Sequence, residues 1–227
     1  MIRLSLPGGE VAFSTRVGGV SDGPFESLNL GILTDDDRGR VGRNRELLAE
    51  AAGLGERAIA MGWQVHGTEI QSWSGIPRGS DPLEKVDAHV TARDDLGLLV
   101  LVADCLPVAL AGPDRVAIVH CGWRGLAGGI VGRAVGHFDE PPAAAIGPGI
   151  GACCYEVGDE VRAQFEARFA TGRMLDLRAI AEDRLRAAGV ERVEHVDMCT
   201  SCREDLFFSH RRDAGVTGRQ GGLVWRA

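Results

Sequence analysis

Three short apolar runs in the middle of the chain constrain its fold most strongly. They are LGLLVLVA, LPVALAG and VAIVH, at residues 96–103, 106–112 and 116–120. Each run is too short to cross a bilayer and carries apolar residues on both faces of a strand, which is typical of a strand buried inside a sheet. A turn signal at Pro113–Asp114 separates the last two runs. The chain is therefore predicted to contain a buried hairpin whose two faces are both covered.

The turn also predicts the register of this hairpin. Counting back from it pairs Pro107 with His120 and Cys105 with Gly122. The Cys105 thiol and the His120 imidazole are then expected at the same end of one sheet. Two interpretations stay open from the residues alone: a packed cysteine beside a hydrogen-bonded structural histidine, or half of a chemical site.

The rest of the chain alternates between strand and helix patterns, without a repeat or a low-complexity linker. Further strands are predicted at 10–16, on both sides of His66–Gly67 within 58–74, at 143–146, at 191–198, and as a final pair within 205–227. Helical spacing predicts helices over 41–53, 124–138, 158–170 and 175–190. One α+β domain over residues 1–227, with mixed sheets and covering helices, is the simplest account.

The first predicted helix begins near Val41 and ends near Gly53. Its apolar face is expected to carry Leu47, Leu48 and Ala51.

Composition narrows the classes of function. The formal net charge of −7 argues against binding to nucleic acid or to a membrane surface. The N-terminal sequence has no signal-peptide pattern, so a cytoplasmic protein with reduced thiols is expected. Lys85 is the only lysine, and an anion site must therefore use arginine side chains or backbone N–H groups.

A third candidate ligand comes from the QVHG stretch, where His66 lies at a strand end before Gly67. Together, His66, Cys105 and His120 form a three-ligand set for Zn²⁺. Three protein ligands leave a fourth position open, which is the arrangement of a catalytic zinc rather than a structural one.

A glycine-rich turn follows His120 in the stretch CGWRGLAGG. Gly122 precedes a predicted helix, where free N–H groups could hold a phosphate or carboxylate, and Arg124 could add charge. A tight turn with close helix packing is the alternative. Arg43 and Arg211 are further candidates for an anion clamp, although each could instead form a solvated ion pair.

The other cysteines give weaker signals. The CTSC stretch at 199–202 lacks a second cysteine pair, so a structural role is expected rather than a redox or zinc site. Cys153 and Cys154 are expected to be buried packing residues.

Many motifs occur in an order that is similar to one known family. Between about residue 12 and residue 224 the chain resembles the laccase-domain family of YfiH-like and YlmD-like proteins, named multicopper polyphenol oxidases in older usage. The motifs are FSTRVGGVSDGPFESLNLG, QVHG, DAHVT, ADCLPVAL, HCGWRGL, IGPGIGACCYEVGDEV, CTSC, FFSHRRD and TGRQ. The resemblance implies a four-layer α/β/β/α sandwich similar to the catalytic domain of cytotoxic necrotizing factors. One departure is Cys121, where the family commonly has alanine.

The resemblance also implies a site and an activity. It implies Zn²⁺ held by His66, Cys105 and His120. It implies purine nucleoside phosphorylase activity on adenosine, inosine, guanosine and methylthioadenosine, with adenosine deaminase activity. The partners would be purine nucleosides and phosphate, and the protein would be a monomer or a small homo-oligomer.

Three alternatives remain. A metal-free Cys–His amide hydrolase would fit the peptidoglycan precursor editing that is linked to some members. A copper-dependent polyphenol oxidase would use Cu²⁺, but a multicopper site needs many more histidines than the six in this chain, and a single blue-copper ion needs a weak axial ligand, for which Met61 is nearest in sequence. A non-enzymatic metal or nucleotide binder is the third.

Overall fold

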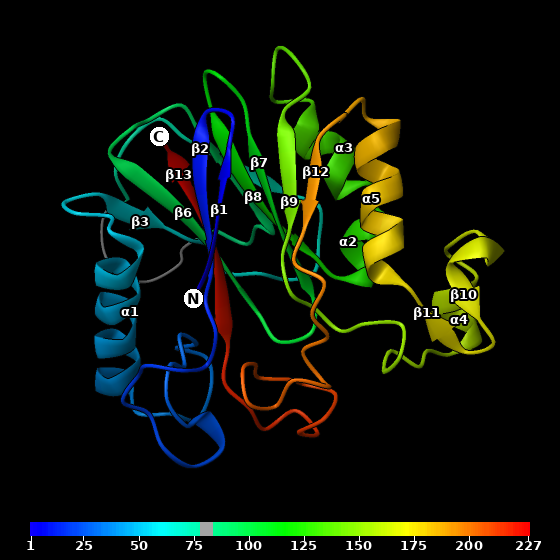
Figure 1. Ribbon diagram of the computed structural model, residues 1–227, viewed down its shortest axis with the longest axis horizontal. Helices are drawn as coiled ribbons and strands as arrows, with labels where there is room; N and C mark the ends of the chain where they lie inside the picture. Colours follow the sequence, from blue (N-terminus) through cyan, green and yellow to red (C-terminus); the bar gives the residue numbers. More distant parts are fainter. Residues whose placement is uncertain (78–83) are drawn as a thin grey trace.

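Two mixed β-sheets stack face to face at the centre of the protein (Figure 1). The computed structural model describes residues 1–77 and 84–227. In the five-stranded sheet, β3 runs parallel to β6 and the other neighbours are antiparallel. The strand order of this sheet is β1 (Ile2–Leu6), β2 (Gly9–Phe13), β13 (Gln220–Arg226), β6 (Leu96–Val102) and β3 (Ala58–Ala60).

The six-stranded sheet contains the predicted hairpin. Pro107 pairs with His120, so the register counted from the turn is confirmed. Its strands lie in the order β12 (Val193–His195), β9 (Ala143–Ile146), β7 (Leu106–Ala111), β8 (Val116–Cys121), β5 (Ala88–Thr91) and β4 (Ile70–Trp73). A small separate ribbon pairs β10 (Ala170–Thr171) with β11 (Met174–Leu175).

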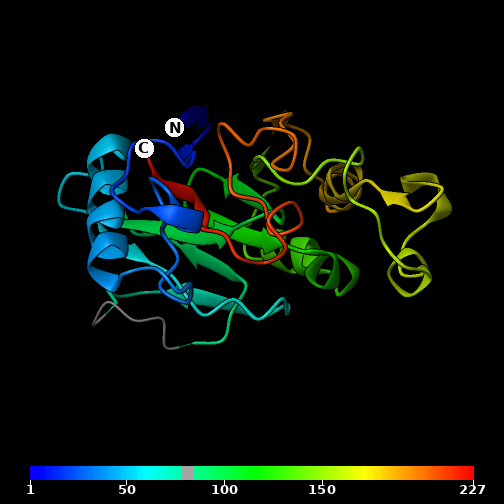
Figure 2. The same cartoon turned by 90° about the horizontal axis from the view of Figure 1, so that it is seen from below.

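Helices cover the outer faces of both sheets. Helix α1 (Arg38–Ala52) packs on the five-stranded sheet, whereas α2 (Trp123–Ala127), α3 (Ile130–Val135) and α5 (Leu177–Ala187) pack on the six-stranded sheet. Short α4 (Asp159–Arg162) lies with β10 and β11 at one end of the molecule (Figure 2). The predicted combination of mixed sheets and covering helices is confirmed, and the similarity to the toxin domain stays a prediction. Every helix in the described residues is too short or too polar to span a bilayer.

His120 and Cys121 are neighbours in β8, but their side chains lie on opposite faces of the sheet. Ile118 packs between the sheets, while Val119 and Cys121 pack against the helices on the outer face. Because successive side chains of a strand point to opposite faces, His120 faces the interior between the sheets and Cys121 faces away from it. Cys121 is fully buried in the helix-side core.

The apolar face predicted for α1 was wrong in part. The buried positions are Val41, Asn44, Leu48 and Ala52, whereas Ala51 is exposed. These positions follow helical spacing, but one of them is polar. The Asn44 amide can be buried because it donates hydrogen bonds to Ser21, Ser27 and Asn29, and these bonds hold the preceding loop against the helix.

Two predicted helices are shorter than expected. The pattern over 124–138 divides into α2 and α3 at Gly128–Gly129, where Gly129 takes the left-handed φ of 82°. The pattern over 158–170 forms only α4 and the 3₁₀ turn η2 (Ala167–Phe169); a second 3₁₀ turn, η1, spans Gly23–Phe25.

The predicted final strand pair was also wrong. Only β13 forms, and it lies between β2 and β6. The segment before it is held by side chains instead, since Gln220 donates to the Phe208 carbonyl and accepts from the Phe208 N–H. The aromatic rings of Phe207 and Phe208 are fully buried, which accounts for the apolar signal without a strand.

Candidate active site

The candidate site lies where the chain crosses twice between the two sheets. The loop at 61–69 leads from β3 in one sheet to β4 in the other, and residues 103–105 lead from β6 to β7. These crossings bring His66 and Cys105 beside His120 of β8. The ligand atoms of the three side chains all lie within 4.8 Å of one another. The two imidazole rings meet edge to face, with centroids 4.8 Å apart.

One buried carboxylate organises two of these three residues. Asp87, just before β5, accepts backbone N–H bonds from Val65, His66 and Gly67 at 3.1, 2.9 and 2.7 Å. The same carboxylate lies 2.7 Å from Nδ1 of His120. His66 itself has a φ of 60°, in the left-handed region that non-glycine residues seldom adopt. Asp87 therefore fixes both the loop that presents His66 and the orientation of the His120 ring.

These residues fit a catalytic zinc ion. Because Nδ1 of His120 is engaged by Asp87, its Nε2 is the nitrogen left for a metal, and carboxylate-oriented histidines of this kind are common at zinc sites. Cys105 is part-buried. Two imidazoles and one thiol would supply three ligands, which would leave a fourth position open. The chemistry of the donor set and its carboxylate support thus agree with zinc.

Without a metal, the same groups form a charged pair. Burial raises the pKa of Cys105, but the opposing effect of His120 and hydrogen bonds from both imidazoles outweigh it and lower the pKa to about 6. Burial lowers the pKa of His120, but Cys105 and Asp87 raise it to about 9. At neutral pH the metal-free site therefore holds a thiolate beside an imidazolium.

This charge state predicts the pH dependence of thiol reactivity in the metal-free protein. We expect the rate of Cys105 alkylation by iodoacetamide to rise with pH around a midpoint of about 6, because the thiolate is the nucleophile and exists above that pKa. Peptide mass spectrometry follows each cysteine separately. Cys121 is the internal control, since burial raises its pKa and closes it to reagent. A midpoint at the ordinary thiol value would contradict the pairing.

A cavity of about 490 Å³ opens onto the three residues. Its wall combines cationic and aromatic side chains. The cationic ones are Arg45, Arg124, Arg211 and Arg219. The aromatic ones are Trp63, Trp123 and Tyr155. Burial raises the pKa of Tyr155 to about 12, so its hydroxyl stays protonated and can donate a hydrogen bond.

The structure brings two of the predicted arginines to this cavity and leaves one out. Arg124 and Arg211 line it, and among the described residues no carboxylate forms an ion pair with either. Arg211 donates to the backbone carbonyl of Glu156, and the Arg124 guanidinium lies over the Trp123 ring. Arg43 does not line it, because its guanidinium pairs with Glu46 and Glu50 on the exposed side of α1. Arg45 lines the cavity instead, since helix residues two apart point in different directions.

Gly122 lies directly against the cluster. A Cβ at this position would be 3.1 Å from Sγ of Cys105 and 3.1 Å from Cδ2 of His66. A side chain there would make the cluster shift by a few tenths of an ångström, so the close approach favours glycine. Gly122 also precedes α2, which has only five residues.

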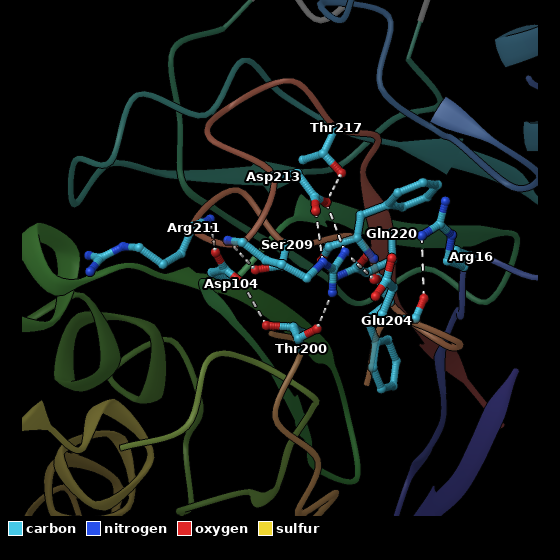
Figure 3. Close-up of polar contacts among 12 residues, drawn as sticks. Arg16, Asp104, Thr200, Glu204, Ser209, Arg211, Asp213, Thr217 and Gln220 are labelled. Carbon is cyan, nitrogen blue, oxygen red and sulfur yellow. Dashed lines mark hydrogen bonds and ion pairs between the residues drawn. The ribbon is translucent and has the colours of Figure 1, made fainter. Parts of the chain in front are cut away.

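A second carboxylate, which sequence reasoning missed, holds the segment that carries Arg211 (Figure 3). Asp104, at a φ of 89°, accepts from Oγ1 of Thr200 at 2.6 Å and from the Arg211 backbone N–H at 2.7 Å. Asp104 directly precedes Cys105, and Asp87 directly precedes a buried strand in DAHVT. An aspartate at either end of a buried apolar run is the signal that could have identified both.

The expectation that Cys153 and Cys154 are buried was wrong. Cys153 is exposed and Cys154 is part-buried. Both lie in the turn after β9, which meets the turn that carries Cys199 and Cys202.

Known proteins are similar to this chain over almost its full length. The family model described as "Multi-copper polyphenol oxidoreductase laccase" matches residues 10–227. The chain is 38% identical to the purine nucleoside phosphorylase YfiH of Shigella flexneri, over 97% of this chain and 95% of that protein. It is 36% identical to the purine nucleoside phosphorylase YlmD of Geobacillus stearothermophilus, over 96% and 90%.

Solved structures are similar over the same range. A hypothetical protein YfiH of Bacillus licheniformis matches with a TM-score of 0.91 at 32% identity, covering 96% of this chain and 92% of that one. YlmD of Geobacillus stearothermophilus matches with a TM-score of 0.84 at 34% identity, covering 96% and 92%.

Proposed function

Because this chain belongs to the multi-copper polyphenol oxidoreductase laccase family, we propose that it is a zinc-dependent purine nucleoside phosphorylase. Adenosine, inosine, guanosine and methylthioadenosine are the proposed nucleosides, and phosphate is the co-substrate. The names of the relatives from Shigella and Geobacillus support the reaction class.

The observation that carries this proposal is the composition of one cavity. Arginine side chains on its wall can bind a phosphate through charge-assisted hydrogen bonds. Trp63, which also lines the cavity and is exposed, offers an apolar face on which a purine can stack. His66, Cys105 and His120 line the same cavity, and a zinc ion held there would supply Lewis acidity toward a substrate oxygen.

The proposed step exchanges one bond for another at the ribose. A phosphate oxygen forms a bond to C1′ while the bond from C1′ to the purine nitrogen breaks, and the base leaves with the electron pair and takes up one proton. Positive charge develops at C1′ as the old bond loosens, and the bound phosphate anion stabilises it. Arg124 and Arg211 hold that phosphate in place, which converts a bimolecular encounter into an oriented one.

The test is a product analysis with the zinc-loaded protein. Adenosine plus phosphate should give adenine and ribose 1-phosphate in equal amounts, and omission of phosphate should abolish ribose 1-phosphate. Failure to form a free base from any of the four nucleosides would overturn the proposal.

The arginines give a prediction with a control in the same chain. Arg211→Ala and Arg124→Ala should each raise the KM for phosphate by about tenfold, because a charge-assisted hydrogen bond contributes about 1.5 kcal/mol or more. Arg43→Ala should leave the KM unchanged, since Arg43 lies outside the cavity. Steady-state kinetics at varied phosphate concentration measure the difference. Equal KM values for phosphate in all three variants would show that Arg124 and Arg211 do not bind phosphate.

The proposal includes adenosine deaminase activity in the same cavity. Water would replace the amino group at C6 of adenosine, giving inosine and ammonia. The assay is inosine formation without phosphate, and its loss in Cys105→Ser together with phosphorolysis would assign both reactions to one site.

A second candidate, a Cys–His amide hydrolase acting on peptidoglycan precursors, is favoured by one observation. Cys105, His120 and Asp87 form a hydrogen-bonded series like that of a cysteine hydrolase. The Cys105 thiolate would attack an amide carbonyl, His120 would protonate the leaving amine, and water would release the acyl group. Chelation separates the candidates, because this hydrolysis would persist in metal-free protein whereas phosphorolysis would stop.

Copper oxidation is not favoured by the donor set. The one other group of metal-ligating side chains found in residues 1–77 and 84–227 contains only cysteine, so the histidine-rich clusters of a multicopper enzyme are not assembled there.

A further inference from the structure

Four cysteines outside the candidate active site form a compact cluster. Cys153 and Cys154 lie in the turn after β9, and Cys199 and Cys202 lie in the turn after β12. These strands are parallel neighbours in the six-stranded sheet, and Gly149 continues the pairing with Cys199. Since parallel strands end at the same edge, the two turns meet. The tertiary structure thus adds the second cysteine pair that CTSC lacks in sequence.

The sulfur atoms have the spacing of a metal-binding set. All four lie within 4.8 Å of one another, and Sγ of Cys202 is 3.6 Å from Cys153 and 3.4 Å from Cys154. Four thiolates around a tetrahedral zinc, each about 2.3 Å from it, would lie about 3.8 Å apart. A disulfide would need a sulfur separation of about 2.05 Å, and all four thiols are free.

The backbone around the cluster is arranged to accept negatively charged sulfur. The Gly151 N–H donates to Sγ of Cys199 at 3.2 Å, and the Cys202 N–H donates to the same sulfur. A Cβ at Gly151 would lie 3.3 Å from Sγ of Cys153 and 3.5 Å from Sγ of Cys199. Glycine at this position therefore leaves room for the sulfurs to converge, while its N–H stabilises a thiolate.

We propose that Cys153, Cys154, Cys199 and Cys202 bind a second Zn²⁺ ion in a closed, tetrahedral structural site. Binding replaces the four thiol protons, which pass to solvent, and leaves a centre of net charge −2 that the two N–H groups support. All four coordination positions are filled by protein, so the ion is closed to substrate. This site is distinct from the His66, Cys105 and His120 cluster and does not rest on the proposed function.

The position of the cluster gives the bound ion a role in shaping the cavity wall. Tyr155 directly follows Cys154, and its ring lies against the Arg211 guanidinium. Thr200 directly follows Cys199 and donates to Asp104, which accepts from the Arg211 N–H. A zinc ion that ties the two turns together would therefore hold the segments that position Arg211 (Figure 3).

The test is a metal count on protein purified under reducing conditions. Wild type should hold about two equivalents of zinc, and Cys199→Ser/Cys202→Ser and Cys105→Ser should each hold about one, by mass spectrometric elemental analysis. The variant that combines all three substitutions should hold none. Equal zinc in wild type and the Cys199→Ser/Cys202→Ser variant, or complete loss of zinc in Cys105→Ser alone, would overturn the proposal.

Cobalt substitution keeps the proposal testable if the double variant fails to fold. Cys105→Ser protein loaded with Co²⁺ should show the strong sulfur-to-cobalt charge-transfer absorption and visible bands of a tetrahedral thiolate site, because four thiolates remain. Cys202 is exposed, so its replacement by serine should disturb the fold little. Adding Cys202→Ser to Cys105→Ser should weaken these bands. Absence of thiolate bands in the Cys105→Ser protein would exclude the site. These readouts are independent of catalysis, so loss of phosphorolysis alone cannot decide them.

Discussion

Cys105→Ser is expected to lower kcat/KM for adenosine phosphorolysis by about a thousandfold, and to remove about one equivalent of zinc. The thiolate is one of the three proposed zinc ligands, and metal-ion stabilisation of transition-state charge contributes several kcal/mol, of which each 1.36 kcal/mol is a factor of ten in rate. The substitution exchanges one atom, so the packing of the site changes little. Elemental analysis and steady-state kinetics on the same preparation measure both effects.

Cys121→Ala is the matched control for this substitution. Cys121 adjoins His120 in sequence, yet its side chain is buried on the opposite face of the sheet among the helix contacts. Zinc content and kcat/KM should therefore match those of the wild type, at a small cost in stability. Cys105→Ser protein that retains both its zinc and its rate would show that the thiol takes no part in the reaction.

Asp87→Asn should lower the zinc affinity of the active site by about ten- to a hundredfold. The same substitution should lower the free energy of unfolding by about 3 kcal/mol, because an amide cannot accept all the N–H groups that converge on the buried carboxylate. Competition with a chromogenic chelator measures the affinity, and urea denaturation of metal-free protein measures the stability.

The effect of Asp87 on stability also depends on pH. Burial raises the pKa of this carboxyl, but hydrogen bonds from His120 and from the backbone outweigh it, so the pKa lies below its usual 3.8. The stabilisation is therefore present above pH 3.8 and is lost as the pH falls through the lower folded value. The difference in stability between wild type and Asp87→Asn should shrink in acid.

Asp95→Asn is the control for the Asp87 substitution. Asp95 is exposed, and within residues 1–77 and 84–227 its carboxylate forms an ion pair with Arg93 alone. Zinc affinity and the unfolding midpoint should therefore not change. If Asp87→Asn behaved like Asp95→Asn, the carboxylate would not be the support of His66 and His120.

Local sequence patterns predicted the elements that depend on near neighbours. The turn at Pro113–Asp114 set the hairpin register correctly, because a short turn leaves few ways to align two strands. The buried positions Leu126, Ile130 and Ala134 followed helical spacing even though a pair of glycines divides the helix. The patterns failed where burial has a nonlocal cause. Phe207 and Phe208 resemble a strand, yet their backbone is held by Gln220 from another segment.

The sequence by itself determined which residue types could serve a metal, and it placed Cys105 and His120 at one end of one sheet. It could not show that a single carboxylate, Asp87, supports both His66 and His120, since those contacts span 21 and 33 residues of sequence. Nor could it show that Arg43 points away from the cavity that Arg45 lines.

The four-cysteine cluster was also decided by the tertiary structure and not by local sequence. Each half is an unremarkable pair in sequence, and the halves meet because β9 and β12 are parallel neighbours that end at one edge of the sheet. Spacing along the chain determines which side chains share a strand or a helix face, because those periods are local. Which strands become neighbours depends on how the two sheets bury their apolar surfaces together, and that choice is made only by the folded structure.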